Sequence, residues 1–456
     1  MLCLRASTQS LFNLGARFAA VALLAAPVSV MAQAQPVVDL TSGLDSLVSL
    51  ALRVNPAVQA AAQRAEAVRA GIETAGTLDD PMLGVGIMNF PVTEPGFSDF
   101  MTMTTVSIGQ RLPYPGKLGL ARQAATLDLR AAEARLEMTR RDVMAEVREA
   151  YYDLAFLDRS LEVIEDNQKL LLGLVQVTES RYAVGTSSQQ EVLRARVETA
   201  NLAEEAVAVT EGRRAALARL NALLDRSSAT PVEEPRIPER VALAAVPASP
   251  QTIQFASGAL GARALDSPLP PLDEMQERAI RNSPLLRAHG AEVMAQAARL
   301  ELANRAHLPD LDLSLQYGYR VNNGDLMSVM VSASLPIHRG ARQDQEVAGA
   351  QAELAALEAG HHGMLNEVRS EVARQYSELE RDRAQLALLV KSVVPQGRAV
   401  LEAATAAFQV GREDFPSVIE SQAALYDYEL AQVRSLAEFA KGLAELERIV
   451  GGEVLP

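Results

Sequence analysis

The sequence is poor in residues that build cross-linked or reactive sites. Its 456 residues include one cysteine, Cys3, five histidines and no tryptophan. A single cysteine allows neither an internal disulfide nor a cysteine-based metal site. Acidic residues outnumber basic ones, 57 to 43, which gives a formal net charge of -14. We therefore expect no nucleic-acid partner, because binding to phosphate requires basic patches.

The sequence also lacks the local motifs of common enzymes. It contains no Gly-x-Ser-x-Gly, no phosphate-binding loop and no His-Glu-x-x-His. His361 and His362 are the only adjacent histidines, while His289, His307 and His338 stand alone. A metal site needs three or four converging ligands, so we interpret these histidines as surface residues. We predict no enzyme activity, no cofactor and no metal site.

Long apolar runs are absent after the N-terminus. Arg5 and Arg17, an apolar stretch at residues 18–30 and the small residues after it predict a signal peptide at residues 1–32. Cys3 would be removed with this peptide. No later run reaches 18 apolar residues, whereas a membrane-spanning helix needs about 20. If the exported chain crosses a membrane, strands must do so.

What the chain does contain is a long internal repeat. Residues 51–56, Ala-Leu-Arg-Val-Asn-Pro, return 228 positions later as residues 279–284, Ala-Ile-Arg-Asn-Ser-Pro. Later landmarks return at offsets between 223 and 228. This period is much longer than that of solenoid repeats, roughly 20 to 50 residues. We predict two structural repeats, at residues 33–225 and 272–456, joined by a proline-rich linker at residues 226–271.

Helical periodicity dominates each repeat. From Val143 a seam steps by four and three residues, and it recurs 225 positions later. This 3.5-residue repeat is typical of left-handed coiled coils. Extended back to Pro115, the first long helix would have about 65 residues and a length of roughly 100 Å. Pro395 is expected to kink the second, because proline removes a backbone hydrogen bond. Shorter helices are predicted at residues 44–77, 189–224, 272–306 and 415–450.

Two strand-like segments lie within each repeat. Residues 310–319 and 328–335 alternate between apolar and polar or small side chains, and residues 83–88 and 102–112 do so less regularly. The alternation is typical of membrane barrel strands with one face towards lipid, but a half-buried soluble sheet would show it too. Four strands are too few to close a barrel, so a barrel would require several copies of the chain.

Three motifs, set among these elements, carry a resemblance to a known family. They are Asp-Asp-Pro-Met-Leu at residues 79–83, Leu-Pro-Tyr-Pro-Gly-Lys at 112–117 and Arg-Tyr-Ala-Val-Gly at 181–185, and the whole order is repeated. The mature chain resembles the TolC-like outer-membrane factors of tripartite efflux pumps. The resemblance implies a mainly α fold with a small β part. Long antiparallel coiled-coil helices form an α-barrel, and four strands per chain contribute to a twelve-stranded β-barrel in a homotrimer.

The same resemblance implies location and partners. The β part lies in outer-membrane lipid, and the helical tunnel extends into the periplasm. Its far end docks on a periplasmic adaptor, which links it to an inner-membrane transporter. The Asp-Pro-Met-Leu start of the first strand, at residues 80–83, and the Asp-Phe-Met-Thr-Met segment at residues 99–103 resemble members that work with heavy-metal cation pumps. The channel would then be a passive exit duct for such cations. Drug efflux and type I protein secretion are alternative roles, and a periplasmic coiled-coil scaffold without a pore is a third.

The resemblance also assigns candidate residues at the ends of the long hairpins. The adaptor-binding tips correspond to Val184, Gly185 and Thr186 in the first repeat and to Val410, Gly411 and Arg412 in the second. The alternative for both glycines is that they only terminate helices, as glycine often does.

Acidic residues beyond the tips surround the closed pore in this family. The candidates here are Glu191, Asp414 and Glu420, whereas Ser417 stands at a position that is acidic in the best-known pattern. For each of these acids the alternative is an ordinary solvated helix face.

Overall fold

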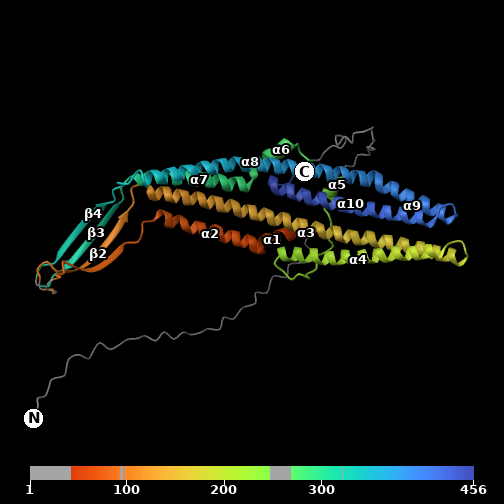
Figure 1. Cartoon of the computed structure of the whole chain (residues 1–456), viewed down its shortest axis with the longest axis horizontal. Coiled ribbons are helices and arrows are strands. Elements are labelled where there is room, and N and C mark those ends of the chain that lie inside the picture. The colour runs from red at the N-terminus through yellow and green to blue at the C-terminus, as the bar shows by residue number, and fades with distance from the viewer. Residues whose placement is uncertain (1–42, 93–95, 98, 247–268, 322, 456) are drawn as a thin grey trace, which may run out of the picture. The chain divides into compact units, whose positions relative to one another are not determined.

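The order helix, helix, strand, strand, long helix, helix occurs twice along the chain (Figure 1). The first half comprises α1 (Leu44–Val54), α2 (Pro56–Gly76), β1 (Met82–Met88), β2 (Met103–Leu112), α3 (Lys117–Ala183) and α4 (Gln189–Leu223). The second half comprises α6 (Leu272–Asn282), α7 (Pro284–Asn304), the 3-10 turn η2 (Arg305–His307), β3 (Leu311–Tyr319), β4 (Leu326–Ala333), α8 (Gln343–Leu388), the π turn η3 (Leu389–Val393), α9 (Val394–Gln409) and α10 (Phe415–Val450). The short helix α5 (Glu239–Ala245) lies between the halves.

This computed structural model describes residues 43–92, 96–97, 99–246, 269–321 and 323–455. The predicted signal peptide and the middle of the predicted linker lie outside the described residues. Within them, the mainly helical fold with four strands confirms the predicted fold class.

Each short helix that precedes the strands is broken once, before a proline. Our expectation of single helices at residues 44–77 and 272–306 is wrong, because α1 ends before Asn55 and α6 before Ser283. Both residues are extended, with ψ of 125° and 116°, since a following proline disfavours the helical conformation. Each side chain then caps the next helix by accepting from a backbone N–H, at 2.9 Å for Asn55 and 3.2 Å for Ser283.

Residues at the two breaks also form hydrogen bonds with the ends of α4 and α10, the last helices of the two halves. Asn55 Nδ2 donates to the Leu223 carbonyl at the end of α4, at 3.0 Å. In the second half Asn282 Nδ2 donates to the Val450 carbonyl at the end of α10, at 3.3 Å. The two bonds occupy equivalent places in the two halves, and each joins residues 168 positions apart.

The long helix of the first half is continuous, whereas that of the second is interrupted. α3 has 67 residues, a length of about 100 Å, and its buried seam includes Val147, Leu154 and Leu171. In the second half α8 gives way to η3, and α9 begins beside Pro395. A π turn shifts the backbone hydrogen-bond pattern and so accommodates the missing N–H of a proline. The interruption expected at Pro395 is therefore present as a π turn.

The strands form one antiparallel sheet in the order β1-β2-β3-β4, and its central pair joins the two halves. The register gathers mostly apolar side chains on one face, whereas the other face mixes polar and small residues with several methionines, among them Met82, Met88 and Met330. The apolar face includes Leu83, Val85, Ile87, Val106, Ile108, Leu311, Leu313, Leu315, Tyr317, Val329 and Val331. Val85 is 75% exposed and Val329 66%, so this face has no covering layer within the chain.

The apolar core lies between helices. One cluster joins α1, α5 and α6 to the middle of α3 and the C-terminal parts of α8 and α10, and it includes Leu47, Leu154 and Phe439. A second cluster lies towards the tips between α3, α4, α9 and α10 and includes Ile164 and Phe415. None of the described helices is both long enough and apolar enough to cross a bilayer.

Candidate functional site

Two helical hairpins end in turns of the same backbone geometry. α3 leads to α4 through Gly185, and α9 leads to α10 through Gly411. Their φ angles are +78° and +74°, a region that glycine occupies without strain. In each turn the glycine N–H donates three residues back and the next N–H five residues back, at 2.9 and 2.8 Å in the first turn and 3.0 and 2.9 Å in the second. This is the Schellman motif that ends many helices.

Both turns present open, apolar surface. Val184 is 74% exposed and Val410 69%. A Cβ atom placed on Gly185 or Gly411 would meet no other atom within 4 Å. Another backbone can therefore approach the turns closely, because glycine adds no side chain to keep it away. The structure thus places all six predicted tip residues on two small, exposed surfaces.

Arg181 joins the two turns within the chain. Its guanidinium lies over the ring of Phe408, 4.3 Å from the centroid, and donates to the Phe408 carbonyl at the end of α9. A positive charge is favourable there because it faces the negative end of the helix dipole. Phe408 packs on Phe415 with ring centroids 5.7 Å apart, and both are buried. The carbonyl of Arg181 also accepts from the N–H of Thr186 at 2.8 Å.

The three acidic candidates near the tips have different surroundings. Asp414 Oδ1 accepts from a backbone N–H at 3.2 Å and caps α10, as Ser188 caps α4. Glu191 is half-buried, and its carboxylate accepts from the hydroxyl of Ser187. Glu420 is exposed and has no ion-pair partner among the residues that the structure describes. No hydrogen bond joins the three candidates to one another.

Glu420 shares one side of α10 with a row of charged residues. Steps of seven lead from Glu420 through Asp427, Arg434 and Lys441 to Arg448, and such steps keep roughly the same side of a coiled-coil helix. The large core residues in the second half of α10 occupy the opposite side. They include Phe439, Leu443, Leu446 and Val450.

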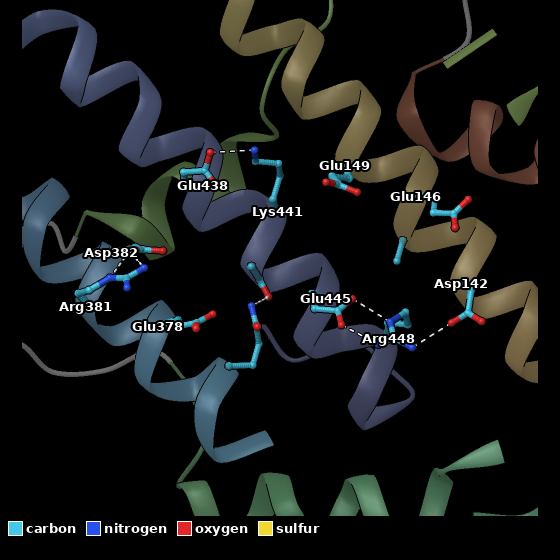
Figure 2. A pocket seen from close by; sticks show the side chains of 13 residues that line it. Asp142, Glu146, Glu149, Glu378, Arg381, Asp382, Glu438, Lys441, Glu445 and Arg448 are labelled. Atoms are coloured by element: carbon cyan, nitrogen blue, oxygen red, sulfur yellow. Dashed lines mark hydrogen bonds and ion pairs between the residues drawn. The ribbon is translucent and has the colours of Figure 1, made fainter. Parts of the chain in front are cut away.

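Lys441 and Arg448, the last two residues of this row, border a charged groove between α3, α8 and α10 (Figure 2). The groove has a volume of about 600 Å³. Seven acidic and three basic side chains line it, so its charge is negative overall. The acids are Asp142, Glu146, Glu149, Glu378, Asp382, Glu438 and Glu445, and the bases are Arg381, Lys441 and Arg448.

Ion pairs hold the basic residues of the groove in place. Arg448 contacts Glu445 at 2.6 Å and Asp142 at 2.9 Å, and these carboxylates raise its pKa. Lys441 contacts Glu438 at 2.8 Å and Asp153 at 2.9 Å. Burial alone would lower the pKa of Lys441, but the two carboxylates outweigh burial and raise it. Both bases therefore stay charged in the groove.

A second charged cluster lies where the sheet meets the long helices. Asp310, just before β3, is 9% exposed. Its carboxylate accepts from Lys117 Nζ at 2.7 Å, the Tyr114 backbone N–H at 2.8 Å and the Arg111 guanidinium at 3.1 Å. Burial raises the pKa of Asp310, but these donors together lower it by more, so the pKa lies below its usual value. The start of β3 is thereby fastened to the Leu-Pro-Tyr-Pro-Gly-Lys turn.

The histidines pair differently from the sequence expectation. The ring of His289 on α7 stacks on that of His361 on α8, with centroids 5.7 Å apart, so His289 does not stand alone. Each ring lies against a glycine of the other helix, Gly360 and Gly290. Both Nδ1 atoms are buried without a hydrogen-bond partner. No group of three or more histidine, cysteine, aspartate or glutamate side chains is placed to hold a metal ion in the described part of the chain.

Sequence reasoning did not identify Asp310, Arg181 or the histidine contact. For Asp310 and Arg181 the partner lies in the other half of the chain, and for His289 it lies on another helix of the same half. Local periodicity carries no information about either kind of contact. One signal was available for Arg181: the equivalent position of the second half is Ala407, so a charged residue occurs at this position in one half only.

Comparison with known proteins shows which family the chain belongs to. A model of the outer membrane efflux protein family matches residues 47–226 and 276–452. The chain belongs to this family. It is 24% identical over 412 residues to the cobalt-zinc-cadmium resistance protein CzcC of Cupriavidus metallidurans, covering 90% of each chain.

Two solved structures show the same fold. The outer membrane protein VceC of Vibrio cholerae has a TM-score of 0.72 and 20% identity, over 90% of this chain and 96% of that one. The channel-forming protein CusC has a TM-score of 0.73 and 13% identity, over 90% and 92%. As a member of the outer membrane efflux protein family, the protein belongs to the cell outer membrane and extends into the periplasm.

Proposed function

We propose that three copies of this protein form the outer-membrane exit channel of a tripartite pump that exports heavy-metal cations. In this role the protein performs no chemistry and provides a passive duct. The energy comes from an inner-membrane transporter, and a periplasmic adaptor connects the two.

The sheet supports assembly into a membrane channel. It has one mostly apolar face and one mixed face of polar, small and methionine side chains, and the apolar side chains are exposed in the single chain. Within a bilayer an apolar outer face is favourable, while every backbone hydrogen-bonding group must be satisfied by closing the sheet. Three copies supply twelve strands for such a closed barrel.

The two tips support docking of an adaptor. They share one backbone geometry, expose Val184 and Val410, and leave open space beside Gly185 and Gly411. Six similar tips in a trimer would give an adaptor a repeated docking surface. Because Arg181 ties one tip to the end of α9, a displacement of one hairpin would be passed to the other.

Negative charge in two places supports a lumen for cations. Glu420 is exposed near the tip, and the groove beside Lys441 and Arg448 has more acidic than basic side chains. A pore lined by net negative charge attracts cations and lowers the barrier to their entry. We assign Glu420 as the main pore carboxylate of the gate, with Glu191 and Asp414 beside it. Asp414 combines this with its role as a helix cap.

The cargo rests on one observation, the similarity to a cobalt-zinc-cadmium resistance protein over 90% of both chains. The test is deletion of the gene in its own host, followed by growth in graded cobalt, zinc, cadmium and copper. We expect tolerance to at least one of these metals to fall several-fold, and the wild-type gene to restore it. Organic drugs serve as the comparison series.

Unchanged tolerance to all four metals, together with loss of resistance to organic drugs, would contradict the assignment of metals and leave the channel in place. Unchanged tolerance to both series would contradict a role in efflux. Complementation with Glu420→Gln tests the gate. The removal of one pore carboxylate should reduce metal tolerance while the amount of protein in the outer membrane stays the same.

A further inference from the structure

The mixed face of the sheet carries two methionines that lie directly opposite each other. Met88, the last residue of β1, pairs with Met103, the first residue of β2, at the end of the sheet away from the helices (Figure 1). Directly opposite residues point to the same face, with Cβ atoms about 4.5 to 5.5 Å apart. Met88 is 42% exposed, so packing in the core of the chain does not account for this pair.

The sulfur of Met103 lies over a glycine of β3. A Cβ atom placed on Gly318 would come within 2.6 Å of Met103 Sδ, which is closer than these atoms can approach. Gly318 is not among the glycines with a positive φ, so its backbone would accept another residue. Glycine inside a strand weakens the strand and often marks a close approach. Here the missing side chain leaves room for the thioether of Met103.

The sulfur of Met88 faces the side chain of Gln316, which is two residues before Gly318 on the same face of β3. Gln316 Nε2 donates to Met88 Sδ across 3.9 Å, so the amide reaches over β2 towards β1. The amide carries one oxygen and one nitrogen at its end. Rotation about the last side-chain bond would therefore present Oε1 to the same place.

Thr105 of β2 lies beneath these side chains. Its direct neighbours on both adjacent strands are glycines, yet Thr105 is only 7% exposed. The long side chains at the adjacent positions of this face are Met88, Met103 and Gln316, so these cover it. The Thr105 hydroxyl donates to a β1 carbonyl at 3.3 Å. Two thioethers and one amide therefore gather above a residue whose own polar group is already bonded.

We propose that the thioethers of Met88 and Met103, together with the amide oxygen of Gln316, bind a soft monovalent cation, Cu(I) or Ag(I). Thioether sulfur is a soft ligand that suits Cu(I), whereas harder cations prefer oxygen ligands. The inference rests on the proposed channel, in which the mixed face of the sheet lines the lumen. It gives this duct a site that selects the softest of its cargo.

The charges at this end of the sheet leave the site to its neutral donors. Arg320 follows β3, and its guanidinium donates to the carbonyls of Gly324 and Phe100, at 2.7 and 3.3 Å, so it is directed towards the loops. Asp325 accepts from the Arg320 backbone N–H at 3.3 Å and provides an opposite charge. A thioether carries no proton to lose, unlike an imidazole or carboxyl ligand. Binding at this site should therefore be almost independent of pH.

Silver binding by the detergent-extracted protein tests the site. The probe is Ag(I) in buffer free of chloride and thiols, and bound silver per chain is measured after equilibrium dialysis. A Cys3→Ser background excludes binding by a thiol. The test variant carries Met88→Leu with Met103→Leu, which nearly conserves volume. The matched control carries Met82→Leu with Met327→Leu, because Met82 lies at the other end of β1 and Met327 on the apolar face.

We expect the parent and the control to bind silver equally, with little change between about pH 6 and 8, and the test variant to bind at least about tenfold more weakly. Equal affinity in the test variant, or no saturable binding by the parent, would overturn the site. Gly318→Ala is a second variant, which retains both sulfurs but fills the space of Met103 Sδ. Its affinity should also fall, and unchanged affinity would overturn the placement of Met103 in the site.

The site and the efflux role can fail separately. Reduced metal tolerance after deletion of the gene, with no silver binding by the protein, would overturn the site and support the channel. Silver binding that depends on Met88 and Met103, with unchanged tolerance after deletion, would support the site and overturn the role in efflux.

Discussion

The carboxylate of Asp310 shows how a single residue can join distant parts of the chain. It accepts from the Tyr114 N–H, 196 positions away, and from the side chains of Lys117 and Arg111. Through these bonds the start of β3 is held against the turn that begins α3. The junction between the sheet and the helices is therefore held by charge-assisted hydrogen bonds, which are stronger than neutral ones.

Asp310→Asn should destabilise this junction. The amide keeps the shape of the side chain but removes the charge and one acceptor oxygen, which leaves Lys117 without its anion. We expect a loss of about 2 to 3 kcal/mol in the free energy of unfolding, seen as a lower thermal midpoint of the detergent-extracted protein. Asp312→Asn is the matched control, because Asp312 is exposed. Equal midpoints for the two variants would contradict the role of Asp310.

The lowered pKa of Asp310 predicts how the stabilising effect of this residue changes with pH. The pKa of Asp310 is lower in the folded protein than in the unfolded chain. Its contribution to stability is therefore complete above its usual pKa of about 4 and is lost as the pH falls through the lower, folded value. Thermal midpoints of the wild type and Asp310→Asn should converge as the pH is lowered below about 4. A difference that grows on acidification would contradict this assignment.

Residue-scale contacts of this kind were beyond sequence reasoning. Asp310 fits the strand alternation as an ordinary polar position, and His289 has no neighbouring histidine in the sequence. Periodicity shows which side of its own helix or strand a residue occupies, whereas these contacts depend on how two separate elements pack against each other. The tip turns were predicted because their geometry is local, set by a glycine at the end of a helix.

At the scale of elements, the long helices and strands could be predicted because their patterns are long and regular. The 3.5-residue seam of α3 and the alternation of β3 each extend over a whole element. The breaks at Asn55 and Ser283 were missed because apolar periodicity continues on both sides of them. The signal was present, since a capping residue followed by proline is typical of a helix start.

The tip turns give an element-scale prediction. Gly185→Leu and Gly411→Leu each place a residue with a side chain in a left-handed conformation, at a cost of about 1 to 2 kcal/mol, but the new Cβ atom has no other atom within 4 Å. We expect normal amounts of oligomer in the outer membrane and a loss of metal tolerance, because the new side chain occupies the proposed docking surface.

Gly173→Leu is the matched control for the tips. Gly173 is exposed within α3, has open space beside it and is not in the left-handed region. This variant should retain full metal tolerance. If both tip variants also retain it, the tips are not the contact with the adaptor.

At the scale of the whole molecule, the structure of one chain is incomplete as a channel. Its sheet has two free edges and an uncovered apolar face. We expect native mass spectrometry of the detergent-extracted protein to find three copies, since three sheets of four strands give a twelve-stranded barrel. A stable monomer, or a complex of two or four copies, would contradict the proposed assembly.

The bonds that tie Asn55 to the end of α4 and Asn282 to the end of α10 make each half start and finish at one place. The path of a half therefore closes on itself. A gene for one half could be copied in tandem without rerouting any helix or strand, which gives a simple origin for the present chain. The same property makes the protein a candidate for circular permutation, with new ends placed at a loop within either half.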